Sequence, residues 1–389
     1  MMADLSTATV LCVVGARPNF IKIAPVIEAL RAEPDPLRTV LVHTGQHYDE
    51  EMADSFFRQL RIAEPEIDLG VGSGTHAAQT AEIMFRFEPV LEKVNPAAVL
   101  VVGDVNSTIA CALVAAKKSI RVIHVEAGLR SYDRSMPEEV NRVLTDQISD
   151  LLFTTEKSAE QNLCREGIDK ERIFFVGNVM IDTLRKHLEN ALPVDTTLLR
   201  NDVDPAKLLE NGKGYGVVTL HRPSNVDNPR VLGRLLDVLA QVSHQLPLVF
   251  PVHPRTEARI RDGHFDFMKS QTVVCLPPLG YLEMLGLMAN ARLVLTDSGG
   301  IQEETTALGV PCVTMRENTE RPVTETEGTN TVVGSDARRI RSVTEDILAT
   351  GGKAGRVPEL WDGKAATRIK EVVVRWLRED RVGLKAHRR

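Results

Sequence analysis

Short apolar runs alternate with amphipathic helical patterns along the whole chain, and this alternation constrains the fold more than any other feature. In the first half the predicted strands are residues 9–16, 39–45, 98–104, 121–127, 151–155 and 172–178. In the second half they are residues 216–222, 247–253, 272–278, 292–299, 311–315 and 331–334. Strands that are each followed by a helix are typical of parallel sheets with helices on both faces. The sequence therefore predicts two doubly wound α/β domains.

The linker between the two domains is expected at the start of the stretch 188–214. This stretch loses the strand–helix rhythm and gains proline, aspartate, asparagine and glycine. At 389 residues with 43% hydrophobic positions, the chain is long enough for two cores of ordinary size. The amphipathic pattern at 365–380 has no strand after it. We expect domains at 1–187 and 188–364, followed by a terminal helical segment at 365–389.

Composition disfavours several kinds of partner and location. The net charge of −6 comes from interspersed acids and bases, which supports neither a nucleic-acid surface nor a polybasic membrane patch. No segment approaches the roughly 18 apolar residues of a membrane span, and the N-terminal apolar run lacks the basic residues and cleavage site of a signal peptide. A soluble, cytoplasmic protein is expected. Five scattered cysteines without CxxC spacing predict reduced, mostly buried thiols: Cys12, Cys111, Cys164, Cys275 and Cys312.

Charged and polar side chains gather directly after the predicted strands, where parallel sheets bind their ligands. The first half supplies carboxylates after its strands, together with two basic residues after the first strand: Asp104, Glu126, Glu138, Arg17 and Lys22. The second half supplies groups that bind anions, together with further carboxylates: His221, Arg222, His253, Ser298, Gly299, Gly300, Glu303, Glu304, Arg316, Glu320 and Arg321. All of these groups lie at the same end of their predicted strands, and this favours a functional role for them over a role in capping helices or packing the core.

Each of these residues also has a purely structural interpretation. Asp104 could help to cap the helix that follows it, and a carboxylate in a first helical turn, such as Glu138, is favoured by the helix dipole. His253 could be a core histidine with satisfied hydrogen bonds. The Ser-Gly-Gly at residues 298–300 could be a tight turn only. These alternatives stay open for each residue taken singly.

A nucleotide diphosphate fits the positive groups of this set. Free backbone amides of Gly299 and Gly300 at a helix N-terminus could bind one phosphate, and Arg17 with His221 another. The Glu304 carboxylate could accept both hydroxyls of a ribose. No GxGxxG follows the first strand and no GxxxxGK[ST] occurs, so neither a dinucleotide cofactor nor a P-loop is supported. No HExxH or clustered metal ligands occur either, and we expect no cofactor and no metal.

A series of motifs spans nearly the whole chain: GARPNFIKIAP, GQH, GD, HVEAGLR, PEEVNR, TLHR, PVHP, TDSGGIQEE and TERP. In this order and spacing they resemble the non-hydrolysing UDP-N-acetylglucosamine 2-epimerases. The resemblance implies the GT-B-like arrangement, two Rossmann-like domains with a central cleft and a C-terminal helix that crosses back to the first domain. It also implies a UDP-sugar substrate, no nicotinamide cofactor and commonly a homodimer.

The resemblance implies anti elimination of UDP from C1 to give 2-acetamidoglucal, followed by reprotonation of C2 from the other face and re-addition of UDP. Inverting C2 in this way needs two proton-handling groups. Matched position by position, Asp104, Glu126 and Glu138 are the acid, base and cation-stabilising candidates, and His221 would steady the departing diphosphate. The other matched positions would hold UDP or the sugar: Arg17, Lys22, Arg142, His253, Ser298, Gly299, Gly300, Glu304 and Arg321. The face of C2 that each carboxylate serves is left open.

The chain departs from the best-known bacterial pattern at RSMPEE and at HRPSNVD, which border the sugar pocket. The sugar therefore stays open between N-acetylglucosamine and a 2,3-diacetamido uronic acid, whose carboxylate Arg134 or Arg222 would meet. Many relatives carry a second UDP-sugar site marked by two glutamines and an arginine. Here Gln46 is followed by Asp49, and residues 69–77 contain no arginine, so activation by substrate is not expected.

Other functions fit parts of the pattern. A hydrolysing 2-epimerase would release free N-acetylmannosamine and UDP. A GT-B glycosyltransferase would share the fold but needs an acceptor and one base, and three matched carboxylates disfavour it. A nucleotide-sugar binding protein would have no use for carboxylates that face the reacting carbon. The sequence favours a UDP-sugar 2-epimerase, and the family implies a place in surface polysaccharide synthesis.

Overall fold

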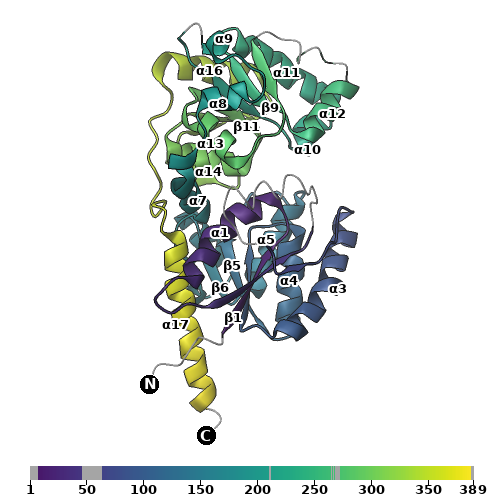
Figure 1. Ribbon diagram of the computed structural model, residues 1–389, viewed down its shortest axis with the longest axis vertical. Helices are drawn as coiled ribbons and strands as arrows, with labels where there is room; N and C mark the ends of the chain where they lie inside the picture. Colours follow the sequence, from purple (N-terminus) through teal and green to yellow (C-terminus); the bar gives the residue numbers. More distant parts are fainter. Residues whose placement is uncertain are drawn as a thin grey trace. The chain divides into compact units, whose positions relative to one another are not determined.

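The computed structural model describes residues 8–45, 64–209, 212–263, 265, 267 and 272–386. The chain divides into two compact units (Figure 1). Unit 1 combines Met1–Arg185 with Glu359–Arg389, and unit 2 is Lys186–Pro358. Within the described residues, no helix is both long and apolar enough to cross a membrane.

The sheet of unit 1 has seven parallel strands in the order β3-β2-β1-β4-β5-β6-β7. Their bounds are β1 Thr9–Val14, β2 Arg38–His43, β3 Ile67–Asp68, β4 Ala98–Val102, β5 Arg121–Ala127, β6 Leu151–Thr154 and β7 Ile173–Phe175. The six strands predicted for this half are confirmed. The sequence did not predict β3, because its two residues are too few to show a periodic pattern.

Alternate side chains of these strands enter two different cores, as the period of two in a strand requires. In β1, Val10 and Cys12 join one cluster, and Leu11 and Val13 join the other. The first cluster is covered by α1, α7 and α17, and the second by α3 and α4. The α-helices in the described residues of unit 1 are α1 Arg17–Arg31, α3 His76–Val94, α4 Asn106–Lys117, α5 Pro137–Ile148, α6 Lys157–Arg165, α7 Val179–His187 and α17 Ala365–Ala386.

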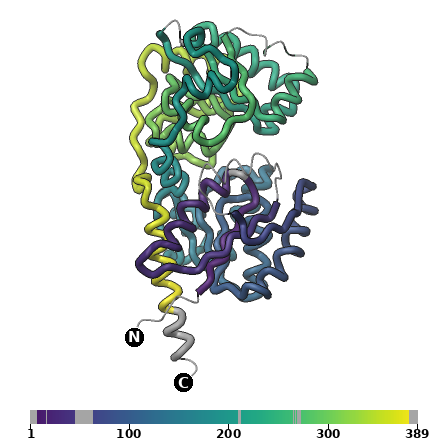
Figure 2. Tube along the Cα trace, in the orientation of Figure 1, coloured from purple at the N-terminus to yellow at the C-terminus, as the bar shows by residue number. Residues whose placement is uncertain are grey.

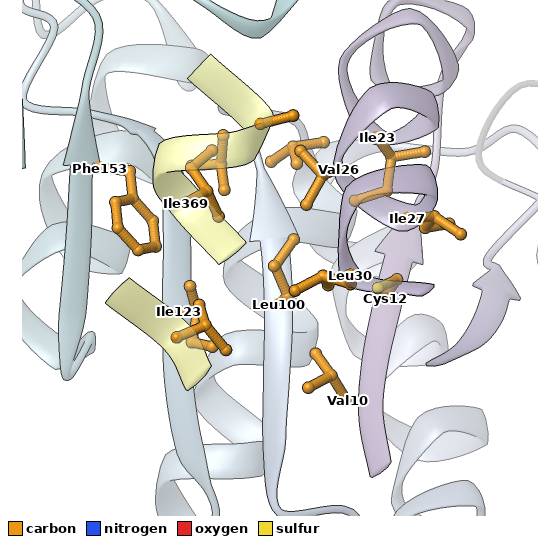
Figure 3. Close-up of a cluster of buried hydrophobic side chains, with 14 of the residues drawn as sticks. Val10, Cys12, Ile23, Val26, Ile27, Leu30, Leu100, Ile123, Phe153 and Ile369 are labelled. Atoms are coloured by element: carbon orange, nitrogen blue, oxygen red, sulfur yellow. The ribbon is translucent and has the colours of Figure 1, made fainter. Parts of the chain in front are cut away.

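The last helix, α17, returns from the end of the sequence to pack on unit 1 beside α1 (Figure 2). Ile369 of α17 enters the same apolar cluster as Val26 of α1 and Leu100 of β4 (Figure 3). Asp182 of α7 fixes the start of α17: its carboxylate accepts hydrogen bonds from the amides of Ala365, at 3.1 Å, and Ala366, at 2.7 Å. These amides belong to a helix N-terminus and would otherwise lack partners.

The sheet of unit 2 has six parallel strands in the order β10-β9-β8-β11-β12-β13. The predicted strands are again confirmed: β8 Gly216–Thr219, β9 Leu248–Pro251, β10 Val273–Leu276, β11 Leu293–Thr296, β12 Cys312–Thr314 and β13 Asn330–Val332. Its helices are α8 Val194–Leu199, α9 Pro205–Leu209, α10 Pro223–Val226, α11 Pro229–Ser243, α12 Pro254–Asp262, α13 Tyr281–Ala289, α14 Gly299–Leu308, α15 Pro322–Thr326 and α16 Ala337–Thr350.

The stretch 188–214, with its linker-like composition, is part of unit 2 and carries two short helices. Leu198 of α8 and Leu208 of α9 are buried in the cluster that also contains Leu287 of α13. Apolar anchors at this spacing are enough to hold a segment whose composition otherwise resembles a linker.

Each sheet has one point where the strand order reverses. In unit 1 it lies between β1 and β4, and in unit 2 between β8 and β11. At such a point the loops after the two strands diverge to opposite faces of the sheet and leave space for a ligand. The residues that follow these strands are therefore the places to look for a site.

Asp182 makes the docking of α17 sensitive to pH. Burial raises the pKa of this carboxyl to about 6, although the amides of Ala366 and Ala365 lower it. The pKa of Asp182 is therefore higher in the folded than in the unfolded protein, and between about pH 4 and about pH 6 the folded state holds a proton that the unfolded state has released. The contribution of Asp182 to the free energy of unfolding is present below about pH 4 and is lost as pH rises to about 6. The free energy of unfolding of the wild type, minus that of Asp182→Asn, should therefore decrease over this range.

Urea unfolding followed by tryptophan fluorescence measures this difference, because both tryptophans, Trp361 and Trp376, belong to unit 1. The exposed Asp169, which also lies in unit 1, provides the control Asp169→Asn, for which the difference should stay flat. A difference that is flat or rises with pH for Asp182→Asn would contradict the assignment.

Candidate active site

Asp104 follows β4, at the strand reversal of unit 1, and is held by Arg142 of α5. The Arg142 guanidinium forms an ion pair with the Asp104 carboxylate through Nη2. Its Nη1 donates to Glu139 Oε2 at 2.6 Å, and the Arg142 side chain is only 3% exposed. One buried arginine therefore joins two carboxylates. This buried pairing shows Arg142 as a positioning group for Asp104, in addition to the substrate-binding role expected of it.

Glu139 is a site residue that the sequence analysis did not single out. Its carboxylate accepts hydrogen bonds from the amides of Ser131 and Tyr132, both at 2.9 Å, as well as from Arg142. It thereby ties the loop after β5 to α5. The signal for this role is the spacing of three residues between Glu139 and Arg142, which places both side chains on one face of a helix.

Glu126 lies near the end of β5 in a strained backbone conformation. Its φ is +71°, in the left-handed region that non-glycine residues rarely adopt. The pairing of β5 with β6 shifts register between Val125 and Ala127, so the strand bulges at Glu126. Strain of this kind persists where the surroundings hold a side chain in place, and it clusters at functional sites.

The buried Lys22 of α1 is the cation that meets Glu126. Its ammonium group forms an ion pair with Glu126 Oε2, and both side chains are almost fully buried. A Cβ on Gly103 would lie only 3.1 Å from Lys22 Nζ, so the ammonium group also lies against the turn that precedes Asp104. One ammonium group therefore contacts both the turn after β4 and the carboxylate of β5. The structure brings Lys22, Glu126 and the Asp104 turn together, and the substrate-binding role expected of Lys22 stays a prediction.

Two other site residues expected in unit 1, Glu138 and Arg17, are not placed in this group of contacts by the structure. Glu138 lies in the first turn of α5 and is half-buried. Within the described part of the chain its side chain makes no recorded hydrogen bond or ion pair, so the helix-dipole interpretation stays open beside the catalytic one. Arg17 begins α1, but its side chain lies outside the described part of the structure, as do Gln46 and Asp49.

His221 follows β8, at the strand reversal of unit 2, and is oriented by Asp297. The Asp297 carboxylate lies 3.0 Å from His221 Nδ1 and accepts from the amides of His221, at 3.1 Å, and Arg222, at 2.9 Å. Burial would raise the pKa of Asp297, but His221 and these amides outweigh it and hold the pKa below its ordinary value. Asp297 is fully buried, and the sequence analysis did not include it among the site residues.

His253 lies beside His221, and the centroids of the two rings are 5.7 Å apart. It follows β9 and is exposed, so the core-histidine interpretation is wrong. Its Nδ1 accepts from the amide of Arg255 at 3.2 Å, which makes it the N-cap of α12. This hydrogen bond fixes the His253 ring at the start of α12.

The Ser-Gly-Gly run forms the N-terminus of α14, with Ser298 as its N-cap residue. Among the residues that the structure describes, no side chain caps this end, so the first amides of the helix are available to an anion. A Cβ on Gly299 would lie 2.7 Å from Nη1 of Arg321, whose guanidinium pairs with Glu303 at 3.1 Å and with Glu320 at 2.6 Å. The missing side chain of Gly299 therefore lets Arg321 reach the helix N-terminus.

Glu304 lies one turn into α14 and is a buried acid. Burial, with a smaller contribution from the neighbouring Glu303, raises its pKa to about 7, although a hydrogen bond with Tyr281 lowers it. A carboxyl with a pKa of about 7 is about half ionised at neutral pH, and its ionised form can accept hydrogen bonds from ligand hydroxyl groups. Among the described residues, no cluster of three or more His, Cys, Asp and Glu side chains could hold a metal ion.

A family profile described as UDP-N-acetylglucosamine 2-epimerase matches residues 28–374. The chain belongs to this family. It is 40% identical over 371 residues to the UDP-N-acetylglucosamine 2-epimerase of Methanocaldococcus jannaschii, covering 93% of this chain and 97% of that protein. It is 39% identical over 372 residues to the UDP-2,3-diacetamido-2,3-dideoxy-D-glucuronate 2-epimerase of Pseudomonas aeruginosa, and the match covers 94% of this chain and 99% of that protein.

Solved structures agree with this family assignment. The Methanocaldococcus jannaschii enzyme in complex with UDP-GlcNAc and UDP superposes with a TM-score of 0.82 at 39% identity, covering 94% of this chain and 99% of that one. The Neisseria meningitidis enzyme bound to UDP-GlcNAc superposes with a TM-score of 0.83 at 30% identity, and the match covers 94% of this chain and 100% of that one. The expected GT-B-like fold class, with two Rossmann-like parallel sheets, is confirmed.

The profile of the UDP-N-acetylglucosamine 2-epimerase family begins at residue 28, after Arg17 and Lys22. The place of Lys22 in the candidate site therefore rests on its contacts with Glu126 and Gly103.

These contacts predict that Lys22 and Glu126 depend on each other for stability. Lys22→Met should lower the free energy of unfolding by about 3–5 kcal/mol, because it leaves the buried Glu126 without its cation. Lys22→Met combined with Glu126→Gln should lose less than the sum of the two single losses, because neither variant side chain is charged. Urea unfolding followed by tryptophan fluorescence measures all three variants. Additive losses would contradict the pairing.

Proposed function

We propose that the chain is a UDP-N-acetylglucosamine 2-epimerase that interconverts UDP-N-acetylglucosamine and UDP-N-acetylmannosamine without net hydrolysis. The observation that carries the proposal is the group built around Lys22: a buried ammonium that holds a strained glutamate, Glu126, next to the turn before Asp104. A site that only binds a nucleotide sugar has no need for carboxylates held in this way. Family membership and the relatives solved with UDP-GlcNAc support the same conclusion.

The reaction proceeds by elimination and re-addition. A carboxylate removes the C2 proton while the C1–O bond breaks, and UDP leaves with the bonding electron pair to give 2-acetamidoglucal. A protonated carboxyl then delivers a proton to the opposite face of C2, and UDP attacks C1 again. Asp104, Glu126 and Glu138 are the groups that we assign to proton transfer and to stabilisation of the positive charge developing at C1.

The anion-binding groups of unit 2 act on the departing UDP. The free amides at Gly299 and Gly300 and the guanidinium of Arg321 bind phosphate, and His221, oriented by Asp297, balances the charge that the leaving diphosphate gains. His253 and Ser298 contribute further contacts to the nucleotide, and Glu304 accepts the ribose hydroxyls. We also assign Arg17 and Arg142 to substrate binding. Bond cleavage at C1 thus has electrostatic support on the leaving-group side.

A second candidate substrate is a UDP-2,3-diacetamido uronic acid, supported by the Pseudomonas aeruginosa relative at 39% identity. Its carboxylate needs a cation in the sugar pocket. Arg222 is a candidate, because its Nε is buried and has no hydrogen-bond partner among the described residues. Arg134 is another, because it is exposed on the loop after β5. The cytoplasmic location, the homodimer and the role in polysaccharide synthesis stay predictions.

The test is to incubate the protein with UDP-N-acetylglucosamine in heavy water and to identify the products by NMR. We expect UDP-N-acetylmannosamine with deuterium at C2. Free N-acetylmannosamine with UDP would instead indicate a hydrolysing enzyme. Turnover only of the diacetamido uronic acid substrate would select the second candidate. Full retention of the original hydrogen at C2 would contradict the elimination mechanism.

Neutral variants test the carboxylates one by one. Asp104→Asn, Glu126→Gln and Glu138→Gln should each lower turnover by at least about a hundredfold, because each removes a proton-handling or charge-stabilising group. UDP should still bind to all three, as calorimetry would show. Each variant is assayed well below its unfolding temperature, because Glu126→Gln also loses the Lys22 ion pair. Near-normal turnover of Glu138→Gln would return that residue to a helix-dipole role.

A further inference from the structure

A buried histidine, His124, lies in β5 two residues before Glu126 and has no part in the mechanism above. Its ring is fully buried. Nε2 lies 2.8 Å from the carbonyl oxygen of Gly103, and Nδ1 lies 2.7 Å from Oδ1 of Asp146 in α5. Both ring nitrogens are therefore at hydrogen-bond distance from an oxygen atom.

Both of these oxygens act as acceptors. A backbone carbonyl can only accept, so Nε2 must carry a proton. The other oxygen of Asp146, Oδ2, accepts from the amide of Gly128 at 3.1 Å and faces the guanidinium of Arg130 at 2.7 Å. A carboxyl with these partners is ionised, so Oδ1 also accepts and Nδ1 must carry a proton as well. The ring donates through both nitrogens, as an imidazolium does.

The charges around this ring are balanced. Arg130 pairs with Asp146 and, through two hydrogen bonds of 2.8 and 2.5 Å, with Glu166. His124 and Arg130 supply two positive charges, and Asp146 and Glu166 supply two negative charges. A buried imidazolium is stable in such a network, because every charge has a partner.

The two bonds of His124 reach the two loops that carry the reacting carboxylates. Gly103, with φ of +67°, directly precedes Asp104. Gly128, with φ of +80°, follows Glu126 by two residues and is held by the same Asp146 that holds His124. The ring therefore links the loop after β4 to the bulged end of β5.

We propose that His124 is a positioning residue of the 2-epimerase reaction: as a doubly protonated ring it fixes the Gly103–Asp104 turn relative to the Glu126 bulge through Asp146. The catalytic part of this inference rests on the proposed function, whereas the protonation of the ring does not. A shift of about 1 Å in a reacting group can lower turnover by about a hundredfold, so this link affects kcat without contacting substrate.

The first test reads the protonation of the ring in the wild-type protein. In a 1H–15N spectrum of histidine side chains near neutral pH, His124 should give two directly bonded N–H signals, one for each ring nitrogen. The variant His124→Gln identifies them, because both disappear. A spectrum in which one ring nitrogen of His124 carries no proton would overturn the proposal, whatever reaction the protein performs.

The second test separates positioning from stability by two variants. The side-chain nitrogen of His124→Gln can take the place of Nε2 and keep the bond to Gly103. The nitrogen of His124→Asn can take the place of Nδ1 and keep the bond to Asp146. The charge-assisted bond to a buried carboxylate stabilises more than a bond to a carbonyl, so the Asn variant should have the higher melting temperature. The Gln variant should have the higher kcat, by about tenfold, because the Asp104 turn keeps its support.

The two rankings should therefore run in opposite directions, with KM for UDP-N-acetylglucosamine nearly unchanged in both variants. A purely structural role would make activity and stability fall together. The same order of the two variants in kcat and in melting temperature would therefore overturn the proposal. A wild-type kcat in His124→Asn would also overturn it. His244→Gln is the matched control, because His244 is exposed at the end of α11, and it should behave as the wild type does. If neither variant folds, the wild-type spectrum still decides: a histidine ring with two slowly exchanging N–H signals supports the proposal, and the absence of any such ring overturns it. If the wild type does not epimerise its substrate, the proposed function fails while the spectrum still tests the ring.

Discussion

A buried carboxylate stays ionised at low cost where a cation and hydrogen-bond donors replace the water that it loses, and the site in unit 1 is organised by this constraint. Glu126 has Lys22, Asp104 and Glu139 share Arg142, and Asp146 has His124 and Arg130. These cations come from α1, α5, β5 and the loop after β5. The pairs therefore fix the helices and loops to the end of the sheet as well as the charges to one another. Removal of any one cation would therefore disturb a whole loop or helix end, and the effect would not be confined to one side chain.

The fold could be predicted from the sequence because its strands are buried on both faces. Continuous apolar runs such as 98–102 and 293–296 stand out from the polar helices between them, and each became a strand. The site was predictable to the extent that it follows from strand order. Asp104, Glu126 and His221 all lie at or directly after the ends of strands near the two reversals, where the parallel topology leads one to look.

The supporting residues could not be predicted in the same way. Asp146 is in the last turns of α5, and its partners His124 and Arg130 precede it in the chain by 22 and 16 residues. Nothing in the sequence distinguishes such an aspartate from one that faces solvent, because its burial is decided by the packing of α5 on α4 and β5. The same holds for Asp297, which a TDSGG run suggests as a turn residue but which is fully buried beneath His221. Partners of this kind become visible only when the fold is known.

The candidate carboxylates differ in their access to solvent, and this difference bears on the chemistry. The Glu126 side chain is 2% exposed, whereas that of Asp104 is 23% exposed although both pair with a buried cation. A proton on Asp104 can therefore exchange with water more readily than one on Glu126. An epimerase of this type needs one group that takes a proton from C2 and another that supplies one to the opposite face. In the elimination and re-addition that we propose, unequal access would let the supplying group draw its proton from solvent while the other group stays shielded.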